Sequence, residues 1–203
     1  MTVEKTSITR DKILAAAREL FQENGFDMTS VREIAAKAGV NVALINYHFG
    51  SKEKLLIAHM EESVGTTRMR LSDINKSDTT PVEKLTAVID LYVDKVFTNC
   101  RYYHFIHREI FSPHRPELVE EITKITSRNT DEFRKMLEEG QRQKVFRKDV
   151  DVQLVSASLI GTINQTSHLV FKKRYTRPNE DEEAYKKRIK KYLHELLSLY
   201  LVK

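Results

Sequence analysis

The residues between positions 42 and 52 combine small apolar, amide, aromatic and basic side chains over a short distance. An Asn side chain can form two hydrogen bonds with the edge of adenine, and small apolar groups can contact the methyl group of thymine. Tyr, His and Lys side chains carry the hydroxyl, ring N–H and ammonium groups that commonly bind phosphate oxygens. This combination therefore indicates contact with duplex DNA. The predicted base contacts are Val42, Ala43 and Asn46, and the predicted phosphate contacts are Tyr47, His48 and Lys52.

Two short helices joined by a tight turn must position these side chains. The first helix is predicted over residues 31–38, where apolar residues recur at helical spacing. Gly39 can adopt the positive φ that a helix exit requires, and Asn41 can cap the next helix. That second helix is expected to end at Gly50, a residue type common just beyond helix C-termini.

A helix, a Gly-containing turn and a second short helix form the arrangement that places side chains in a DNA major groove. Ile45 and Phe49 lie four residues apart, so both can anchor the second helix inward while its other residues face outward. Short patterns of this kind also occur by chance. A three-helix bundle whose short middle helix only packs is therefore the alternative.

The flanking segments complete the predicted first domain. A helix over about 10–24 has an apolar stripe that would brace the other two. Thr29 and Ser30 precede the helix at 31, and helix N-termini bind phosphate readily, so we predict both as further phosphate contacts. A longer helix follows from Ser51 to about Leu71.

The polar, turn-forming segment 72–81 ends in Pro and indicates a domain boundary. We therefore predict a DNA-binding domain over 1–50, a connecting helix over 51–71 and a second domain over 72–203.

The segment from about Thr9 to Leu56 closely resembles the DNA-binding domain of the TetR family of bacterial transcriptional regulators. The resemblance covers roughly a quarter of the chain, and it weakens at Leu44 and Asn46, so the operator sequence does not carry over. It implies a ligand-responsive repressor that binds a palindromic operator as a dimer and is released by a small-molecule effector. The residues that carry it are Phe21, Gly25, Thr29, Ile34, Ala35, Ala38, Gly39, Val40, Tyr47, His48, Phe49, Lys52 and Leu55.

The rest of the chain favours an all-α fold. Pro and Gly number only four and six, and the alternating pattern typical of strands is missing from the sequence. Pro113 and Pro116 indicate a break between two helices. Five further helices are predicted, over about 81–99, 102–111, 116–144, 150–173 and 181–202. With the first domain, they give an N-terminal three-helix helix-turn-helix domain followed by a C-terminal helical bundle for ligand binding and dimerisation.

Composition bears on the compartment and, less directly, on the partner. The lone Cys100 excludes an internal disulfide and suits a reducing compartment, and residues 1–10 lack the apolar stretch of a secretory signal, so we expect a cytoplasmic protein.

The net charge is +5, but residues 1–71 carry ten Lys and Arg against nine Asp and Glu. The surplus lies over 172–191, where a solvated helix face is the usual explanation and an acidic partner or non-specific DNA contact is the alternative.

Residues 152–171 include no charged side chain, which raises the question of a membrane span. The segment has too many hydroxyl and amide groups for contact with lipid, so we expect a helix covered by protein and no membrane partner. Its small residues, among them Ala157 and Gly161, would allow it to lie against a copy of itself. In the family that the chain resembles, the last two helices of each subunit form the dimer interface, and we predict a homodimer through those helices.

Members of that family bind an effector within the C-terminal bundle. An apolar wall with a few amide and imidazole groups is typical of small-ligand pockets, although a core with satisfied polar groups has the same composition. The candidate lining residues are Tyr92, Val96, Cys100, Tyr103, His107, Phe111, Met136, Asn164, Gln165 and His168.

We expect neither a cofactor nor a metal. His104 and His107 share a helix face and could join His168 or Glu109 around a metal, but an isolated pair three residues apart is more typical of ordinary histidines. Cys100 favours a packing role over a redox role. The sequence lacks a P-loop, a dinucleotide fingerprint and a nucleophile elbow. A helical enzyme, or an interaction module that retains the motif without specific DNA binding, is the alternative function.

Overall fold

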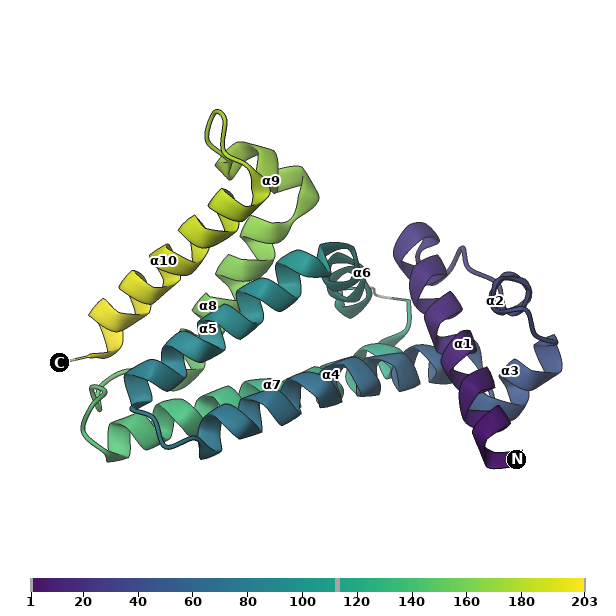
Figure 1. The fold of residues 1–203 in the computed structure, drawn as a ribbon, viewed down its shortest axis with the longest axis horizontal. Helices are drawn as coiled ribbons and strands as arrows, with labels where there is room; N and C mark the ends of the chain where they lie inside the picture. The colour runs from purple at the N-terminus through teal and green to yellow at the C-terminus, as the bar shows by residue number, and fades with distance from the viewer. Residues whose placement is uncertain (1, 112–113, 203) are drawn as a thin grey trace. The chain divides into compact units, whose positions relative to one another are not determined.

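The computed structural model describes residues 2–111 and 114–202, and within these ranges the chain is helical with no strand (Figure 1). The predicted all-α fold is confirmed. Pro113, which was predicted to mark a break, lies outside the described residues. The helices are α1 (Thr2–Asn24), α2 (Val31–Ala38), α3 (Val42–Phe49), α4 (Lys52–Lys76), α5 (Pro81–Thr98), α6 (Cys100–Ile110), α7 (Pro116–Arg142), α8 (Val152–Ser167), α9 (Leu169–Tyr175) and α10 (Glu182–Leu201).

Helix α4 extends five residues beyond its predicted end at Leu71. Its last turn is polar, but the side-chain amide of Asn75 donates to the Glu132 backbone oxygen at 3.1 Å and to its carboxylate at 3.2 Å. These bonds hold the turn against α7. Polarity alone therefore does not end the helix.

The helix predicted over 150–173 is two helices, because the backbone becomes extended at His168 (φ −65°, ψ 125°). The Tyr185 hydroxyl donates to the Thr166 carbonyl oxygen at 2.9 Å. That carbonyl lies in the last turn of α8, where intrahelical donors run out. A side chain from α10 thus stabilises the end of α8.

The chain divides into two compact units, one made of residues 1–65 and 105–126 and the other of residues 66–104 and 127–203. This division differs from the predicted 1–50, 51–71 and 72–203. Both α4 and α7 contribute residues to each unit, and the second half of α6 belongs to the first unit. The physical reason is that the end of α6 and the start of α7 contact α1 and the loop after it.

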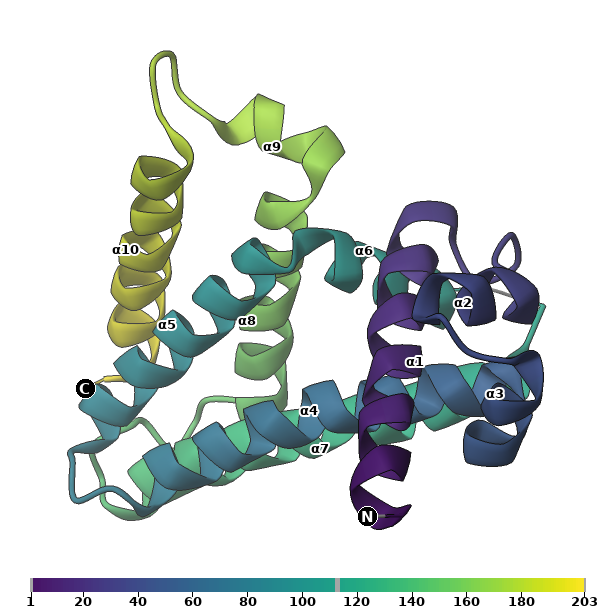
Figure 2. The same cartoon turned by 45° about the vertical axis from the view of Figure 1, so that its right-hand side comes forward.

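Each unit has its own apolar core. In the first unit, α1 packs on α2 and α2 on α3 around buried residues such as Phe21, Ile34 and Ile45. In the second unit, α5 packs against both α8 and α10 (Figure 1 and Figure 2). Its buried residues include Val93 and Tyr185. No helix in the described part of the chain has the length and apolar character needed to cross a membrane.

His59 on α4 is buried in the first unit, and desolvation, with a smaller contribution from the charge of Arg18, lowers its pKa to about 4. Below the ordinary His pKa of about 6.5, the unfolded chain therefore binds a proton that the folded chain does not. The free energy of unfolding should fall as the pH drops from 6.5 through 4, by about 2 kcal/mol at pH 5 relative to pH 8. Urea unfolding at several pH values measures this. In His59→Gln, the free energy of unfolding should depend less on pH in this range. An equally steep pH dependence in that variant would contradict the prediction.

Candidate nucleic-acid interface

Local capping interactions define the two helices of the predicted reading motif. Ser30 caps α2 through a reciprocal pair of bonds, because its hydroxyl accepts from the Glu33 N–H at 3.2 Å and the Glu33 carboxylate accepts from the Ser30 N–H at 2.7 Å. Gly39 ends α2 in the left-handed conformation (φ 66°, ψ 36°). The Asn41 side chain accepts from the Ala43 N–H at 2.8 Å and caps α3. The predicted caps and the Gly50 stop are therefore confirmed.

Helix α3 is anchored on one side and open on the other. Ile45 is fully buried and Phe49 nearly so, as predicted from their spacing. Ala43 and Asn46 are exposed, and Tyr47 is 78% exposed. Val42 and His48 are partly exposed. An aromatic ring and apolar groups left in water on one helix face are typical of a binding surface.

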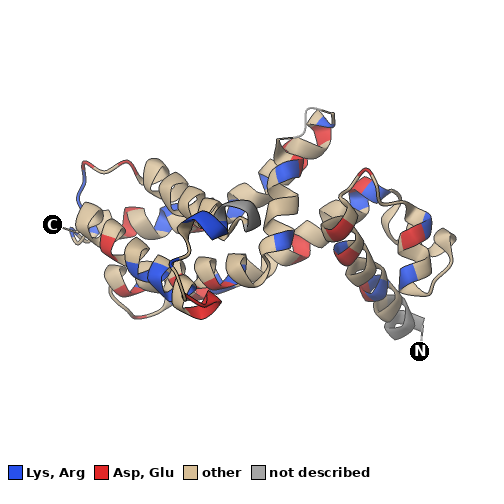
Figure 3. Cartoon of the chain, turned by 90° about the horizontal axis from the view of Figure 1, so that it is seen from above, with Lys and Arg blue, Asp and Glu red and all other residues tan. Residues whose placement is uncertain are grey.

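Helix α3 carries no Lys, Arg, Asp or Glu, and the positive charge of the chain is spread over both units (Figure 3). Electrostatic attraction to phosphate must therefore come from residues beside α3. Ser30 is exposed at the start of α2 and stays a predicted phosphate contact, as do Tyr47 and His48. Arg10, which was not predicted, lies next to the motif, with its guanidinium carbon 5.6 Å from the centre of the Phe49 ring. Arg10 and Phe49 are 39 residues apart in the sequence, so the sequence alone does not indicate this contact.

The predicted phosphate contact of Thr29 is wrong. The side chain is fully buried, and its hydroxyl donates to the Gly25 carbonyl oxygen at 2.7 Å, with the Leu20 carbonyl oxygen at 3.2 Å as a second acceptor. These acceptors belong to the end of α1, whose last carbonyl groups lack intrahelical donors. Thr29 therefore fixes the exit from α1 and cannot reach a phosphate.

The contacts of Lys52 favour a positioning role over the predicted phosphate contact. Its ammonium group donates to the carbonyl oxygens of Phe26 at 2.8 Å and Thr29 at 2.9 Å, and it lies 4.3 Å from the centre of the Phe26 ring. Lys52 thereby ties the start of α4 to the loop between α1 and α2. That loop leads directly into the reading motif.

Lys52→Met should lower the free energy of unfolding by about 1–3 kcal/mol, because it removes charged hydrogen bonds to two partly buried carbonyl groups while retaining the aliphatic stem. Affinity for DNA should fall on all sequences, whereas the slope of log affinity against log salt should stay unchanged. Urea unfolding and fluorescence anisotropy over a salt series measure the two effects. A slope smaller by about one unit would instead identify Lys52 as a phosphate contact.

A second contact that was not predicted joins the α6–α7 connection to the loop after α1. Arg115 forms an ion pair with Asp27, and it also donates to the Glu109 carboxylate at 2.6 Å. Its guanidinium carbon lies 4.8 Å from the centre of the Phe26 ring. Glu109 is buried, so Arg115 neutralises a carboxylate that water does not reach. Nothing in the local sequence connects residues 27 and 115.

The candidate effector residues differ in burial and in the unit to which they belong. Val96 and Met136 are buried in the core of the second unit, and Tyr92 and Tyr103 pack against that core. Burial raises the pKa of the Tyr92 phenol. The partly buried members of the set are Cys100, Asn164 and His168.

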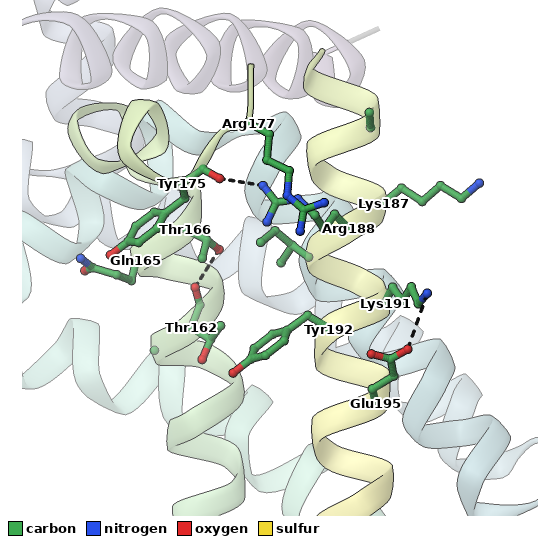
Figure 4. Close-up of a pocket in the computed structure, with 13 residues that line it drawn as sticks. Thr162, Gln165, Thr166, Tyr175, Arg177, Lys187, Arg188, Lys191, Tyr192 and Glu195 are labelled. Atoms are coloured by element: carbon green, nitrogen blue, oxygen red, sulfur yellow. Dashed lines mark hydrogen bonds and ion pairs between the residues drawn. The ribbon is translucent and has the colours of Figure 1, made fainter. Parts of the chain in front are cut away.

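His107 and Phe111 are corrected, because both are exposed and lie in the first unit with their rings 4.7 Å apart. Gln165 is exposed and lines a groove between α8 and α10 (Figure 4), so its place in an effector pocket stays a prediction. His104 contacts His168, at 4.2 Å between ring centres, and no group of three or more His, Cys, Asp or Glu in the described residues is placed to hold a metal.

Comparison with known proteins relates both units to one class of regulator. Residues 13–59 match the family model for bacterial regulatory proteins of the tetR family, and residues 78–168 match the model for a tetracyclin repressor-like C-terminal domain. The chain is 28% identical to the fatty acid metabolism regulator protein of Bacillus subtilis, over 76% of this chain and 79% of that protein. It is 31% identical to the probable HTH-type transcriptional regulator YttP of the same organism, over 68% and 67%.

Among solved structures, the transcriptional regulator FadR from Bacillus subtilis in complex with stearoyl-CoA resembles the chain with a TM-score of 0.75. The two are 26% identical, and the superposition covers 90% of this chain and 96% of that one. The likeness therefore extends through both compact units.

Proposed function

The chain belongs to the TetR family of bacterial transcriptional regulators, and from this membership we propose that it represses transcription by occupying a palindromic operator as a homodimer. Helix α3 of each subunit enters the major groove, where Val42, Ala43 and Asn46 contact bases. Ser30, Tyr47 and His48 contact phosphate, together with Arg10. The observation that carries the proposal is the surface of α3, which exposes an amide and small apolar groups while Ile45 and Phe49 anchor it. Such a regulator acts on DNA in the cytoplasm.

The test is binding to the DNA upstream of the protein's own gene across a salt series. A regulator should select a short inverted repeat and lose affinity steeply as salt rises, because phosphate contacts release counterions. A helical enzyme or an interaction module should show no sequence preference, and that result would overturn the proposal.

Asn46→Ala should cost about 1–3 kcal/mol of binding free energy on the preferred operator, because it removes a bidentate contact with one base. Substitutions at that base pair should then have little effect, while the salt slope should not change. Anisotropy measurements on a set of operators altered at single positions would show both. Uniform weakening on every sequence would contradict a base-reading role for Asn46.

The homodimer forms through α8 and α10 in this proposal. Leu154 on α8 is 63% exposed and Leu199 on α10 is 83% exposed, and Leu196 and Tyr200 are exposed as well. Apolar groups of this size are stabilised when a second copy covers them. The exposed Ala157 and Gly161 allow helices of the two copies to approach closely. A two-fold axis also matches a palindrome whose half-sites lie about 34–36 Å apart or wider.

The effector in this proposal is an acyl-CoA. Support comes from the named role of the Bacillus subtilis fatty acid regulator and from the stearoyl-CoA in the similar structure. The acyl chain occupies the second unit, beside Val96 and Met136. The effector releases the operator only as far as it binds the released state more tightly than the DNA-bound state. Stearoyl-CoA should therefore dissociate the operator complex, and absence of release across acyl chain lengths would exclude this class of effector.

A further inference from the structure

Leu44 on α3 is an apolar side chain that the base and phosphate contacts proposed above do not include. It is 38% exposed. Helix α3 lies at the edge of the first unit (Figure 1). The exposed surface of the reading helix therefore has one more large apolar group than the proposed contacts account for.

Local contacts fix the position of Leu44 on the helix. The Asn41 side chain caps α3, and the Leu44 N–H donates to the Asn41 carbonyl oxygen at 2.9 Å. Ile45 is fully buried and Phe49 nearly so, and a rotation of α3 about its axis would expose both of them to water. The Leu44 side chain is therefore held outside the anchored face of α3.

Leu44 belongs to a continuous apolar surface. Residues three or four positions apart are neighbours on an α-helix, so Tyr47 lies beside both Ala43 and Leu44. Ala43 is exposed, Tyr47 is 78% exposed and Val42 is partly exposed. The first turn of α3 thus presents three consecutive aliphatic side chains that carry no hydrogen-bonding group. An apolar surface of this kind indicates a site of contact with another molecule.

The major groove of duplex DNA offers an aliphatic side chain one apolar partner. All four bases present nitrogen or oxygen atoms there, and thymine also presents its C5 methyl group. An aliphatic side chain over a polar base edge displaces water and supplies no hydrogen bond in return, which weakens binding. Contact with the methyl group instead removes apolar surface from water on both sides. The first turn of a recognition helix is also the part that contacts base edges.

We propose that Leu44 is a specificity-determining residue that contacts the C5 methyl group of a thymine in each half of the operator. The assignment rests on the DNA binding proposed above, and it adds a requirement for an A·T pair. Residues two positions apart on an α-helix differ by about 200° around its axis, so Leu44 and Asn46 point to different sides of α3. The thymine read by Leu44 therefore belongs to a different base pair from the base read by Asn46.

A protein partner is the other explanation for an exposed apolar surface. The interface proposed for the homodimer consists of α8 and α10 in the second unit, so it does not account for Leu44 in the first. The same short helix also exposes the Asn46 amide and the Tyr47 side chain. Amide groups suit base edges and hydroxyl groups suit phosphate, so the composition of the surface favours DNA.

The experiment replaces each thymine of the operator in turn by deoxyuridine, which lacks the C5 methyl group but keeps the hydrogen-bonding groups. The operator is the inverted repeat selected in the binding test above, and fluorescence anisotropy measures its affinity for the full-length protein. At one position of each half-site, the replacement should weaken binding about fourfold, since burial of one methyl group contributes this much. Leu44→Ala should bind the thymine and uracil operators equally well, because its side chain no longer reaches the methyl group.

A second variant and a matched control complete the experiment. Leu44→Met retains an apolar side chain of similar size, so it should remain sensitive to the uracil replacement. Met69→Ala truncates an apolar side chain that is 70% exposed on α4, outside the reading motif, and it should respond to uracil as the unmodified protein does. Ala is favourable in a helix, so Leu44→Ala should leave the subunit folded, which circular dichroism checks.

The outcomes separate this inference from the proposed function. A protein that selects the operator but responds to uracil equally with and without Leu44 would overturn the inference and retain the function. Uniform weakening of Leu44→Ala on every sequence would identify a contact with the sugar–phosphate backbone and would also overturn it. Altered self-association of Leu44→Ala with unaltered sensitivity to uracil would identify a contact between copies instead. A protein that selects no sequence would overturn both proposals.

Discussion

Leu199→Lys should leave the subunit folded but raise the dissociation constant of the proposed dimer by about a hundredfold or more. Leu199 is 83% exposed and lies in the last turn of α10, where a cation is favourable to the helix. The substitution therefore costs the isolated subunit little. Across a two-fold interface, however, it replaces an apolar contact with two ammonium groups close to each other, and like charges in a contact cost several kcal/mol.

Operator binding should fall with dimerisation, because two linked reading helices gain effective concentration that one helix lacks. Analytical ultracentrifugation measures self-association, circular dichroism checks folding, and anisotropy measures operator affinity. Met69→Lys is the matched control, since Met69 is 70% exposed on α4 and lies outside the proposed interface. A Leu199→Lys protein that remains dimeric, or a Met69→Lys protein that dissociates, would exclude the α8–α10 interface.

Arg115→Met should lower the free energy of unfolding by about 3 kcal/mol, because it leaves the buried Glu109 carboxylate without the closer of its two ion partners. The Asp27 contact, which joins residues 88 positions apart, is lost as well. The start of α7 should then separate more easily from the loop after α1. We expect the variant to bind operator but to respond less to effector, since this contact connects the α6–α7 segment with the reading motif.

Glu109→Gln in the Arg115→Met background should recover most of the lost stability, because it removes the buried charge instead of restoring the ion pair. Urea unfolding of the single and double variants gives this coupling free energy. Arg108→Met serves as the control, because that guanidinium is largely exposed and lies 3.7 Å from the same carboxylate. If Arg108→Met lowered the free energy of unfolding as much as Arg115→Met does, the buried Arg115–Glu109 pair would have no special role in stability.

Features set by neighbouring residues could be predicted from sequence. The bounds of α2 and α3 follow from Gly39, Asn41 and Gly50, whose capping roles depend on the backbone within a few residues. The inward anchors of α3 follow from a spacing of four. These interactions are local, so periodicity and residue type contain the information.

Features set by distant partners could not be predicted. The Lys52 ammonium donates hydrogen bonds to two carbonyl groups more than twenty residues away. The end of α8 is stabilised by the Tyr185 hydroxyl from α10. His107 and Phe111 were predicted to line a pocket in the second unit, but both lie in the first unit, because α6 passes from the second unit into the first at Phe105. Helical spacing shows which residues share a face, but it does not show where that face changes its neighbours.

The absence of ionic side chains from α3 has an evolutionary consequence. Exchanging Val42, Ala43 and Asn46 would give a new target site while leaving the dependence on ionic strength almost unaltered, because the cation proposed to bind phosphate, Arg10, belongs to another helix. After a duplication of the gene, the two proteins could therefore come to control different promoters while each keeps its sequence-independent affinity for DNA.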